Sequence, residues 1–251
     1  MARFALRRCA AALLLLLLVL SVTFFLVHAA PGDPLGMVED QRMTAEQREH
    51  LRALYGLDRP LPVQYLAWLS AVALHGEWGI SFENQRPVTR LISEALPATL
   101  LLAVAALSLQ YGLGLFLGVA AARHRGTLAD HALRLFSLLL YSQPVFWLGL
   151  MAVLLFSLVW PILPASHMHD VGADEMGSLG RLADLARHLV LPTLVLGLPS
   201  AARIARFVRG SLLEVLGREY ITTARSKGLS ERRVIWVHGV RNALLPLIQV
   251  F

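Results

Sequence analysis

Charged residues and cysteine are scarce in this chain of 251 residues. Charged residues make up 16% of it, against about 25% in an average soluble domain, and 56% of the residues are hydrophobic. The apolar residues form long runs that a soluble domain of this size is too small to bury. Cys9 is the single cysteine, which excludes an internal disulfide and a cysteine-based zinc site. These shortages exclude disordered, fibrous and disulfide-rich secreted proteins, and they favour an all-α, polytopic transmembrane helix bundle.

Lysine is nearly absent as well, since Lys227 is the one lysine among 23 basic residues. Gly228 follows it, so the chain contains no Walker A loop and cannot bind ATP by that route. An intramembrane hydrolase would need a serine–histidine or paired-acid site at membrane depth. His28 is the only ionisable residue well inside a predicted span, and no partner for it is evident. We therefore expect no catalytic residues, no cofactor and no enzymatic activity.

Five apolar segments are candidates for helices that cross a bilayer, whose core requires about 20 residues. They are Cys9 to Ala30, Leu96 to Ala122, Leu135 to Trp160, Leu189 to Arg203, and Val240 onward to Phe251. The first is longer than the apolar core of a signal peptide, so we expect an uncleaved span. Pro144 predicts a kink in the third, and Pro192 and Pro199 are further candidate bend points. Because a helix cannot end halfway across a bilayer, we expect the fifth span to be incomplete and the chain to be truncated at its C-terminus.

Small and polar residues interrupt the apolar spans at a few positions. Gly114 and Gly118 lie four residues apart, a spacing that allows close helix approach, and we expect ordinary packing in the bundle rather than a dimer motif. Gln110, Ser142 and Gln143 are polar residues in or near spans, where polar groups usually face the protein interior. They are candidates for a translocation path, with hydrogen bonding to a neighbouring helix as the alternative.

Basic and acidic residues are unevenly distributed between the spans. Residues 1–8, 123–134 and 203–241 together carry 15 basic and 4 acidic residues, whereas 31–95 and 161–188 together carry 8 basic and 13 acidic residues. The positive-inside rule places the first set, with the amino terminus, in the cytoplasm and the second set outside. The net charge of +6 is therefore explained by topology, without an anionic partner such as nucleic acid.

Three regions follow from this topology. Residues 1–30 are the N-terminal segment and first transmembrane helix, and 31–95 form an extracytoplasmic loop or cap. Residues 96–251 are the core domain, incomplete at its C-terminus, with a cytoplasmic loop at 203–241. Within the cap we expect one helix capped by Thr44 and a second, amphipathic helix from Gln64 to Leu74. The acidic residues Asp33, Glu39 and Asp40 are expected to be solvated rather than a catalytic pair.

One short sequence looks like a metal-binding cluster. His167 and His169 are two residues apart, and Asp170 follows them. Such residues can bind a transition metal, but the spacing is unspecific. We therefore expect an exposed polar loop and no metal site.

The basic loop at 203–241 predicts two helices joined by a sharp turn. Ser211 to Lys227 can form the first helix, and Gly228 suits the left-handed position that ends it. Ser230 can cap the second helix, with Glu231 in its first turn. The spacing also fits a helix-turn-helix DNA reader. Membrane spans flank the loop closely, however, so we favour a docking helix that passes force from a soluble motor to the bundle.

The same loop resembles the cytoplasmic signature of ABC-importer permeases, and most closely that of the first permease in the dipeptide, oligopeptide and nickel group. The matching runs are EYITTARSKGLSERR at 219–233, RNALLP at 241–246, PGDP at 31–34, YGLDRPLPVQY at 55–65, LPATL at 96–100 and SQPVFWLG at 142–149. Thr222-Thr223-Ala224 stands where the general signature has Glu-Ala-Ala, and residues 238–241 replace its Ile-x-Leu-Pro. The peptide group shares these departures, but the role of the leading glutamate does not carry over.

The resemblance implies a type I permease fold and an ATPase-coupling loop. Its residues would be Glu219, Tyr220, Thr223, Ala224, Arg225, Lys227, Gly228, Leu229, Arg232 and Arg233. The basic residues would pair with acids of an ATPase, and Ala224 and Gly228 would permit close packing.

The implied partners are two ABC ATPase subunits, a second homologous permease, an extracytoplasmic solute-binding protein and the lipid bilayer, without nucleic acid. The implied location is the inner membrane of a bacterial or archaeal cell. The implied activity is import of di- or oligopeptides by alternating access, with nickel, nickel chelates or glutathione-like solutes as alternatives.

Overall fold

The computed structural model describes residues 2–29, 46, 49–50, 53, 56–81 and 84–244. These residues are predominantly helical, and their only strand-like pairing is an isolated bridge between Ile80 and Pro87. The chain divides into two compact units, Met1–Leu96 and Pro97–Phe251. The all-α membrane architecture expected from the composition is thus confirmed, and each unit has its own internal packing.

The first unit is built on α1 (Ala2–Ala29) and α3 (Leu61–Ser70), which continues as the π-helix η2 (Ala71–His75). Most apolar side chains of α1 are exposed, as expected for a helix that faces lipid. The two helices meet through aromatic rings, because Phe24 contacts both Tyr65 and Trp68. The Tyr65 hydroxyl lies 2.6 Å from Ser21 Oγ. A helix is therefore present over the residues Gln64 to Leu74 where one was expected, and it packs on α1, whereas the helix expected after Thr44 lies largely outside the described residues.

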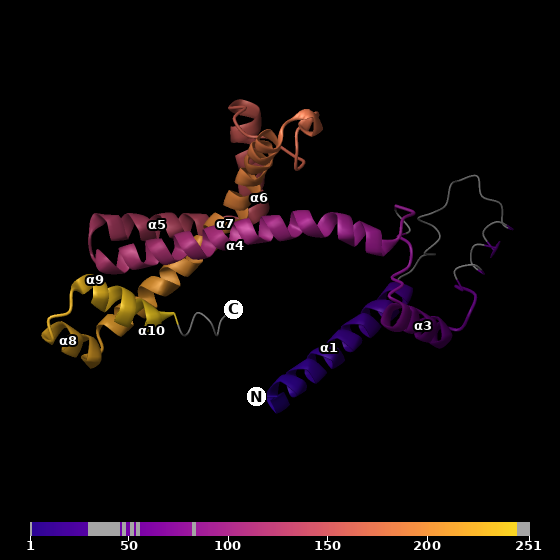
Figure 1. The fold of residues 1–251 in the computed structure, drawn as a ribbon, viewed down its shortest axis with the longest axis horizontal. Coiled ribbons are helices and arrows are strands. Elements are labelled where there is room, and N and C mark those ends of the chain that lie inside the picture. Colours follow the sequence, from indigo (N-terminus) through magenta and orange to yellow (C-terminus); the bar gives the residue numbers. More distant parts are fainter. Residues whose placement is uncertain are drawn as a thin grey trace. The chain divides into compact units, whose positions relative to one another are not determined.

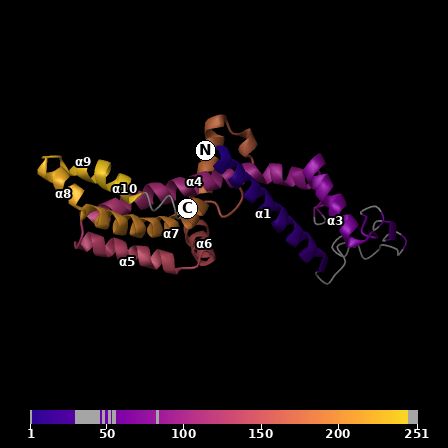
Figure 2. The same cartoon turned by 90° about the horizontal axis from the view of Figure 1, so that it is seen from below.

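The second unit begins with a series of long and short helices (Figures 1 and 2). They are α4 (Val88–Arg123), whose residues before Pro97 belong to the first unit, α5 (Leu128–Ser142), α6 (Val145–Val153), the π-helix η3 (Leu154–Val159), the short 3-10 helix η4 (Ala173–Glu175) and α7 (Ser178–Leu216). Both α4 and α5 pack against α7, which is therefore the central helix of this unit.

Small residues allow α4 and α7 to approach closely. A Cβ placed on Gly114 would lie 2.8 Å from Ile204 Cβ, and one on Gly118 would lie 2.7 Å from Val208 Cβ. Both glycines are buried, and the opposing residues are among the most buried in the chain. The prediction that these glycines serve packing within the bundle is confirmed.

The observed helices differ from the predicted spans in their lengths, and one predicted span is divided into two helices. Among the described residues, three helices, Arg3–Ala29, Val88–Arg123 and Ser178–Leu216, are long and apolar enough to cross a membrane. At about 1.5 Å per residue, α4 and α7 measure roughly 54 and 58 Å, so they extend well beyond a bilayer core of about 30 Å. The fourth span is predicted from Leu189 to Arg203, which is only the middle of α7. Much of the fifth, from Leu245 onward, lies outside the described residues.

The kink predicted at Pro144 is in fact a break between two helices. α5 and the helix that follows it meet at 97°. Gln143 and Pro144 are both extended, with ψ near 138° and 134°. A proline disfavours helix in the residue before it, and Pro144 then occupies the position that caps the next helix. The third span is therefore a bent pair of helices, either a broken span or a re-entrant segment.

The glycine contact between α4 and α7 generates a stability prediction. Replacing Gly118 by valine places atoms against Val208 and the Ala205 carbonyl, so we expect a loss of about 1–3 kcal/mol. Gly112→Val in the same helix is the control, because nothing lies within 4 Å of its added Cβ. The temperature at which the detergent-solubilised chain loses its monodisperse elution peak should fall for the first variant only. Equal shifts for the two variants would contradict the packing role.

Candidate functional site

The segment after α7 contains two short helices and a turn, but its first helix is shorter than expected. α7 ends at Leu216, and α8 covers Glu219–Ser226. Arg218, which is extended with ψ of 148°, separates them. The single helix predicted from Ser211 to Lys227 is therefore wrong. Gly217, a weak helix former, lies at the point where the chain leaves the helix.

The turn after α8 has the predicted conformation. Gly228 has a φ of 77°, in the left-handed region that glycine adopts without steric cost. Beyond it lie α9 (Glu231–Arg233), the π-helix η5 (Val234–Val240) and α10 (Arg241–Ala243). Ser230 occupies the N-cap position as expected, but its side chain makes no capping hydrogen bond. We call residues 217–243 the docking segment.

Two small apolar cores fix the docking segment to the end of α7. In the first, Ile221, Ala224 and Val234 are buried together, and Leu216 and Leu229 pack around them. In the second, residues of η5 and α10 join α4 and α7; its members are Val119, Ala122, Ile204, Val208, Leu212, Ile235, Val240 and Ala243. Leu212, Ile221 and Val234 have no exposed surface. Fully buried side chains of this size contribute about 1.5–3 kcal/mol each, so the segment is a firmly attached extension of α7.

An ion pair bridges the Gly228 turn. The Arg225 guanidinium donates to both carboxylate oxygens of Glu231, with Nη2–Oε1 at 2.7 Å and Nε–Oε2 at 3.1 Å. These hydrogen bonds lower the pKa of Glu231 and raise that of Arg225. Because the pKa of Glu231 is depressed in the folded state, the stabilisation is present above its ordinary range and is lost as the pH falls through the depressed value. Both side chains are about half exposed, so the pair orients the turn more than it stabilises the fold.

Most residues predicted to couple to an ATPase are exposed at the surface of the docking segment. Exposed are Glu219, Tyr220, Thr223, Arg225, Lys227, Gly228, Arg232 and Arg233. Beside them is an open hollow of about 360 Å³, lined by Ser230, Arg232, Arg233, Trp236 and Val237. Trp236 is 43% exposed, although apolar residues of this size are usually buried. The surface therefore combines several positive charges with an apolar anchor, which is a composition typical of protein interfaces.

Two predicted residues face inward. Ala224 is buried against Ile221 and Val234, and Leu229 is half-buried at the same core. The small side chain of Ala224 thus serves packing within the chain, not against a partner. Sequence reasoning also missed Asn242, whose Nδ2 donates to the Tyr220 hydroxyl at 3.1 Å. Asn242 is 22 positions from Tyr220 in the sequence, so no local pattern predicts this contact.

A buried ion pair that the sequence analysis did not identify joins α5 to α7. Arg209 donates to Asp130 through Nε at 2.7 Å and Nη2 at 2.8 Å, and Gly126 N donates to the same carboxylate at 3.1 Å. The Asp130 side chain is fully buried, and that of Arg209 is 20% exposed. A signal existed in the sequence, because Asp130 is the one acid in the otherwise basic segment 123–134. The pair lies close to the end of α7 that carries the docking segment.

The candidate path residues occupy separate positions. Gln110 is half-buried in the middle of α4, and Gln143 is half-buried in the break between α5 and α6. Ser142 is exposed, and its hydroxyl donates to the Leu138 carbonyl of its own helix at 2.7 Å. This bond lies within α5, so it is not the hydrogen bond to a neighbouring helix that was expected as the alternative. The structure does not gather the three side chains into one site.

The comparisons with known proteins agree with this architecture. The binding-protein-dependent transport system inner membrane component family matches residues 114–251, and its N-terminal companion family matches residues 1–103. The chain belongs to this family. It is therefore a multi-pass permease subunit of an ABC importer.

Individual relatives are similar over nearly the whole of this chain and about three quarters of their own length. The dipeptide transport system permease of Escherichia coli is 38% identical over all of this chain and 78% of its own length. The di/tripeptide permease of Pseudomonas aeruginosa is 40% identical over 92% of the chain and 72% of its own length. The oligopeptide permease of Bacillus subtilis is 34% identical over all of the chain and 78% of its own length.

The buried pair between α5 and α7 generates a second stability prediction. Asp130→Asn leaves Arg209 without its carboxylate in a largely buried position, so we expect a loss of roughly 3 kcal/mol. Adding Arg209→Gln to that variant should restore part of the loss, because no unpaired charge remains. The measurement is the free energy of unfolding in mixed micelles titrated with SDS, followed by circular dichroism.

Asp174→Asn is the matched control for this measurement. Asp174 pairs with Arg181 at 3.3 Å but is fully exposed, so its replacement should change the free energy of unfolding by less than about 1 kcal/mol. Equal losses of unfolding free energy for Asp130→Asn and Asp174→Asn would contradict a larger stabilising contribution from the buried pair.

Proposed function

We propose that the permease imports peptides and that its docking segment couples transport to ATP hydrolysis on separate subunits. The observation that carries this proposal is an exposed, basic helix–turn–helix surface fixed by a continuous apolar core to α7, a candidate membrane span. A firmly attached segment of this kind can transmit displacement, whereas a flexible loop would absorb it. Family membership supports the same role, since importers of this family depend on a binding protein and an ATPase.

The assembly that we propose has two ATPase subunits, a second homologous permease and an extracytoplasmic solute-binding protein. The docking segment sits in a cleft of one ATPase in the cytoplasm, and the amino terminus lies on the same side. Arg225, Lys227, Arg232 and Arg233 face acidic groups of that cleft, and Trp236 adds an apolar anchor. The uneven distribution of basic residues over the loops supports this orientation.

Transport follows from coupled movement of α7 and its neighbours. When the ATPase pair closes on ATP, the docking segment moves with it and displaces the end of α7. The Asp130–Arg209 pair passes this movement to α5, and the extended residues Gln143 and Pro144 are the hinge that lets α6 move separately. The bundle then alternates between outward-open and inward-open states. Gln110, Ser142 and Gln143 are candidates for the path lining.

The proposed solutes are di- and oligopeptides. The relatives from Escherichia coli, Pseudomonas aeruginosa and Bacillus subtilis are named for dipeptides, di- and tripeptides, and oligopeptides. Uptake of a labelled dipeptide into proteoliposomes that hold the whole importer tests the solute class. Competition by unlabelled peptides supports it, whereas exclusive uptake of a nickel chelate or glutathione would contradict it.

A single substitution in the turn tests the coupling role. Gly228→Asp puts a carboxylate on the docking surface, in open space where its added Cβ meets nothing within 4 Å. The left-handed conformation costs about 1 kcal/mol with a side chain, so the fold should persist. We expect ATP-driven peptide uptake to fall at least tenfold while membrane insertion is unchanged.

Gly76→Asp is the matched control for the turn variant. Gly76 has a φ of 66°, also with nothing within 4 Å of an added Cβ, but it ends η2 in the first unit. Its substitution imposes the same backbone cost at a residue that is not part of the docking segment, and uptake should stay near the unmodified rate. Normal uptake by the Gly228→Asp importer, with its ATPase still bound, would refute the coupling role.

A further inference from the structure

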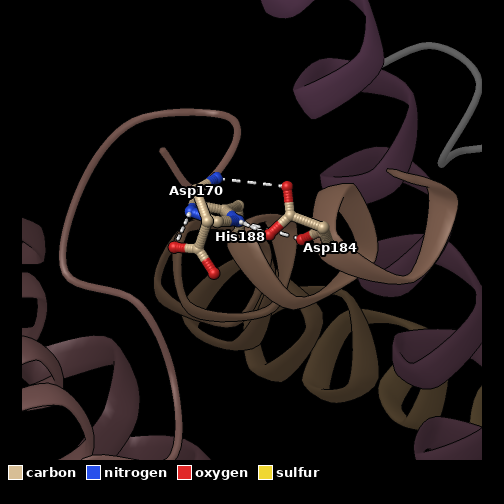
Figure 3. A group of neighbouring side chains, drawn as sticks. All are labelled: Asp170, Asp184 and His188. Atoms are coloured by element: carbon tan, nitrogen blue, oxygen red, sulfur yellow. Dashed lines mark hydrogen bonds and ion pairs between the residues drawn. The ribbon is translucent and has the colours of Figure 1, made fainter. Parts of the chain in front are cut away.

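A cluster of two carboxylates and a histidine lies at the end of α7 opposite the docking segment (Figure 3). Asp184 and His188 are one turn apart on α7, and Asp170 comes from the loop between η3 and η4. One potential ligand atom from each residue lies within 4.8 Å of the other two. The sequence predicts no metal site at His167, His169 and Asp170, whereas the fold brings Asp170 together with two residues of α7.

The surroundings of His188 fix which ring nitrogen is free. Its Nδ1 lies 2.9 Å from the Asp184 carbonyl oxygen and 3.2 Å from Asp184 Oδ1, and both of these atoms accept hydrogen bonds. A neutral imidazole therefore carries its proton on Nδ1 and presents a lone pair on Nε2. Histidines that bind metals usually have this arrangement, in which a carbonyl or carboxylate holds the other nitrogen.

The free nitrogen faces Asp170 at a separation that suits a shared ion. His188 Nε2 and Asp170 Oδ1 are 3.6 Å apart, which is too long for a hydrogen bond. Two ligands of a tetrahedral Zn²⁺, each bonded at about 2.0–2.2 Å, stand about 3.4 Å apart. Asp184 lies on the other side of the imidazole, against Nδ1, and so holds the ring in place, while the exposed Asp170 side chain can adjust to share the ion with Nε2 (Figure 3).

The burial and charge of the cluster also favour a cation. Asp184 and His188 are 6% and 7% exposed, and a buried carboxylate is costly without a positive partner. Among the described residues, the ion pairs of Asp170 and Asp184 involve only His169 and His188, which are charged only when protonated. A divalent ion would supply the missing positive charge.

Residues around the cluster hold Asp184 by hydrogen bonds, and a cavity leads from the surface to His188. Asp184 Oδ2 lies 3.0 Å from His169 Nδ1 and accepts from Asp170 N at 3.2 Å, so the carboxylate is held in place. A partly open cavity of about 420 Å³ reaches His188 between α6 and α7, with Ser166 and His167 at its polar end. His167 adopts a φ of 67°, an uncommon conformation for a residue other than glycine that is often found at functional sites.

We propose that Asp170 and His188 Nε2 bind a divalent transition metal such as Zn²⁺, with Asp184 orienting the imidazole through Nδ1 and water as the remaining ligands. Imidazole and carboxylate donors suit this class of ion. The bound ion ties the loop that carries Asp170 to α7, opposite the end on which the ATPase is proposed to act. The site does not depend on the proposed transport function, and its test measures metal binding only.

The test is metal binding by the full, tag-free chain in detergent. After dialysis against a chelator and then Zn²⁺, elemental analysis should find one Zn²⁺ per chain. Co²⁺ in its place should give visible absorption bands between about 500 and 650 nm, which Zn²⁺ then abolishes. Asp170→Asn is the primary variant, because Asp170 is exposed and its replacement should leave the fold intact. We expect Asp170→Asn and His188→Gln each to weaken Zn²⁺ binding at least tenfold.

His75→Gln is the matched control, because His75 is an exposed histidine at the end of η2, outside the cluster. It should bind Zn²⁺ like the unmodified chain. Binding that is absent from the unmodified chain, or that is the same in Asp170→Asn and His75→Gln, would overturn the proposal. The cluster would then be a hydrogen-bonded latch between the loop and α7.

Discussion

The burial of apolar side chains at the end of α7 is the interaction on which the rest of the structure depends. Val208 and Leu212 of α7 are almost completely inaccessible, and they are covered by α4 on one side and by η5 and α10 on the other. The same helix contacts Gly114 and Gly118 of α4 and forms the buried ion pair with α5. The docking segment is therefore held by α4 and α7 together, and α5 is joined to α7 by the ion pair.

The fold class and the general form of the docking segment could be predicted from the sequence, because both depend on local patterns. Long apolar runs predict spanning helices, and Gly228 predicts a left-handed turn wherever the chain lies in space. Gly114 and Gly118 predicted a close helix contact correctly, although only the structure shows that the partner is α7. The family signature pointed to the same docking role that the closely flanking spans favour.

The features that the sequence did not predict depend on distant partners or on competing local preferences. Asp130 and Arg209 are far apart in the chain, so their pairing requires the packing of α5 on α7. The hydropathy pattern predicts that the fourth span ends at Arg203, because arginine is typical of the loop that follows a span. In the helix, however, Arg203 and Arg206 lie over the ring of Tyr141, so charged residues are accommodated within α7. The helix therefore continues to Leu216.

The central claim is that the docking segment and α7 move together, while the break at Gln143 and Pro144 lets α6 move relative to them. Distances between pairs of spin labels, measured by double electron–electron resonance, test this directly. The measurement uses the assembled importer with Cys9 replaced by serine. One spin-label pair joins Thr222→Cys to Glu214→Cys, and another joins Thr222→Cys to Phe146→Cys; all three positions are exposed, and none is among the residues proposed to contact the ATPase. On ATP binding, the first distance should stay constant and the second should change. A change in the first distance, or constancy of the second, would contradict the account.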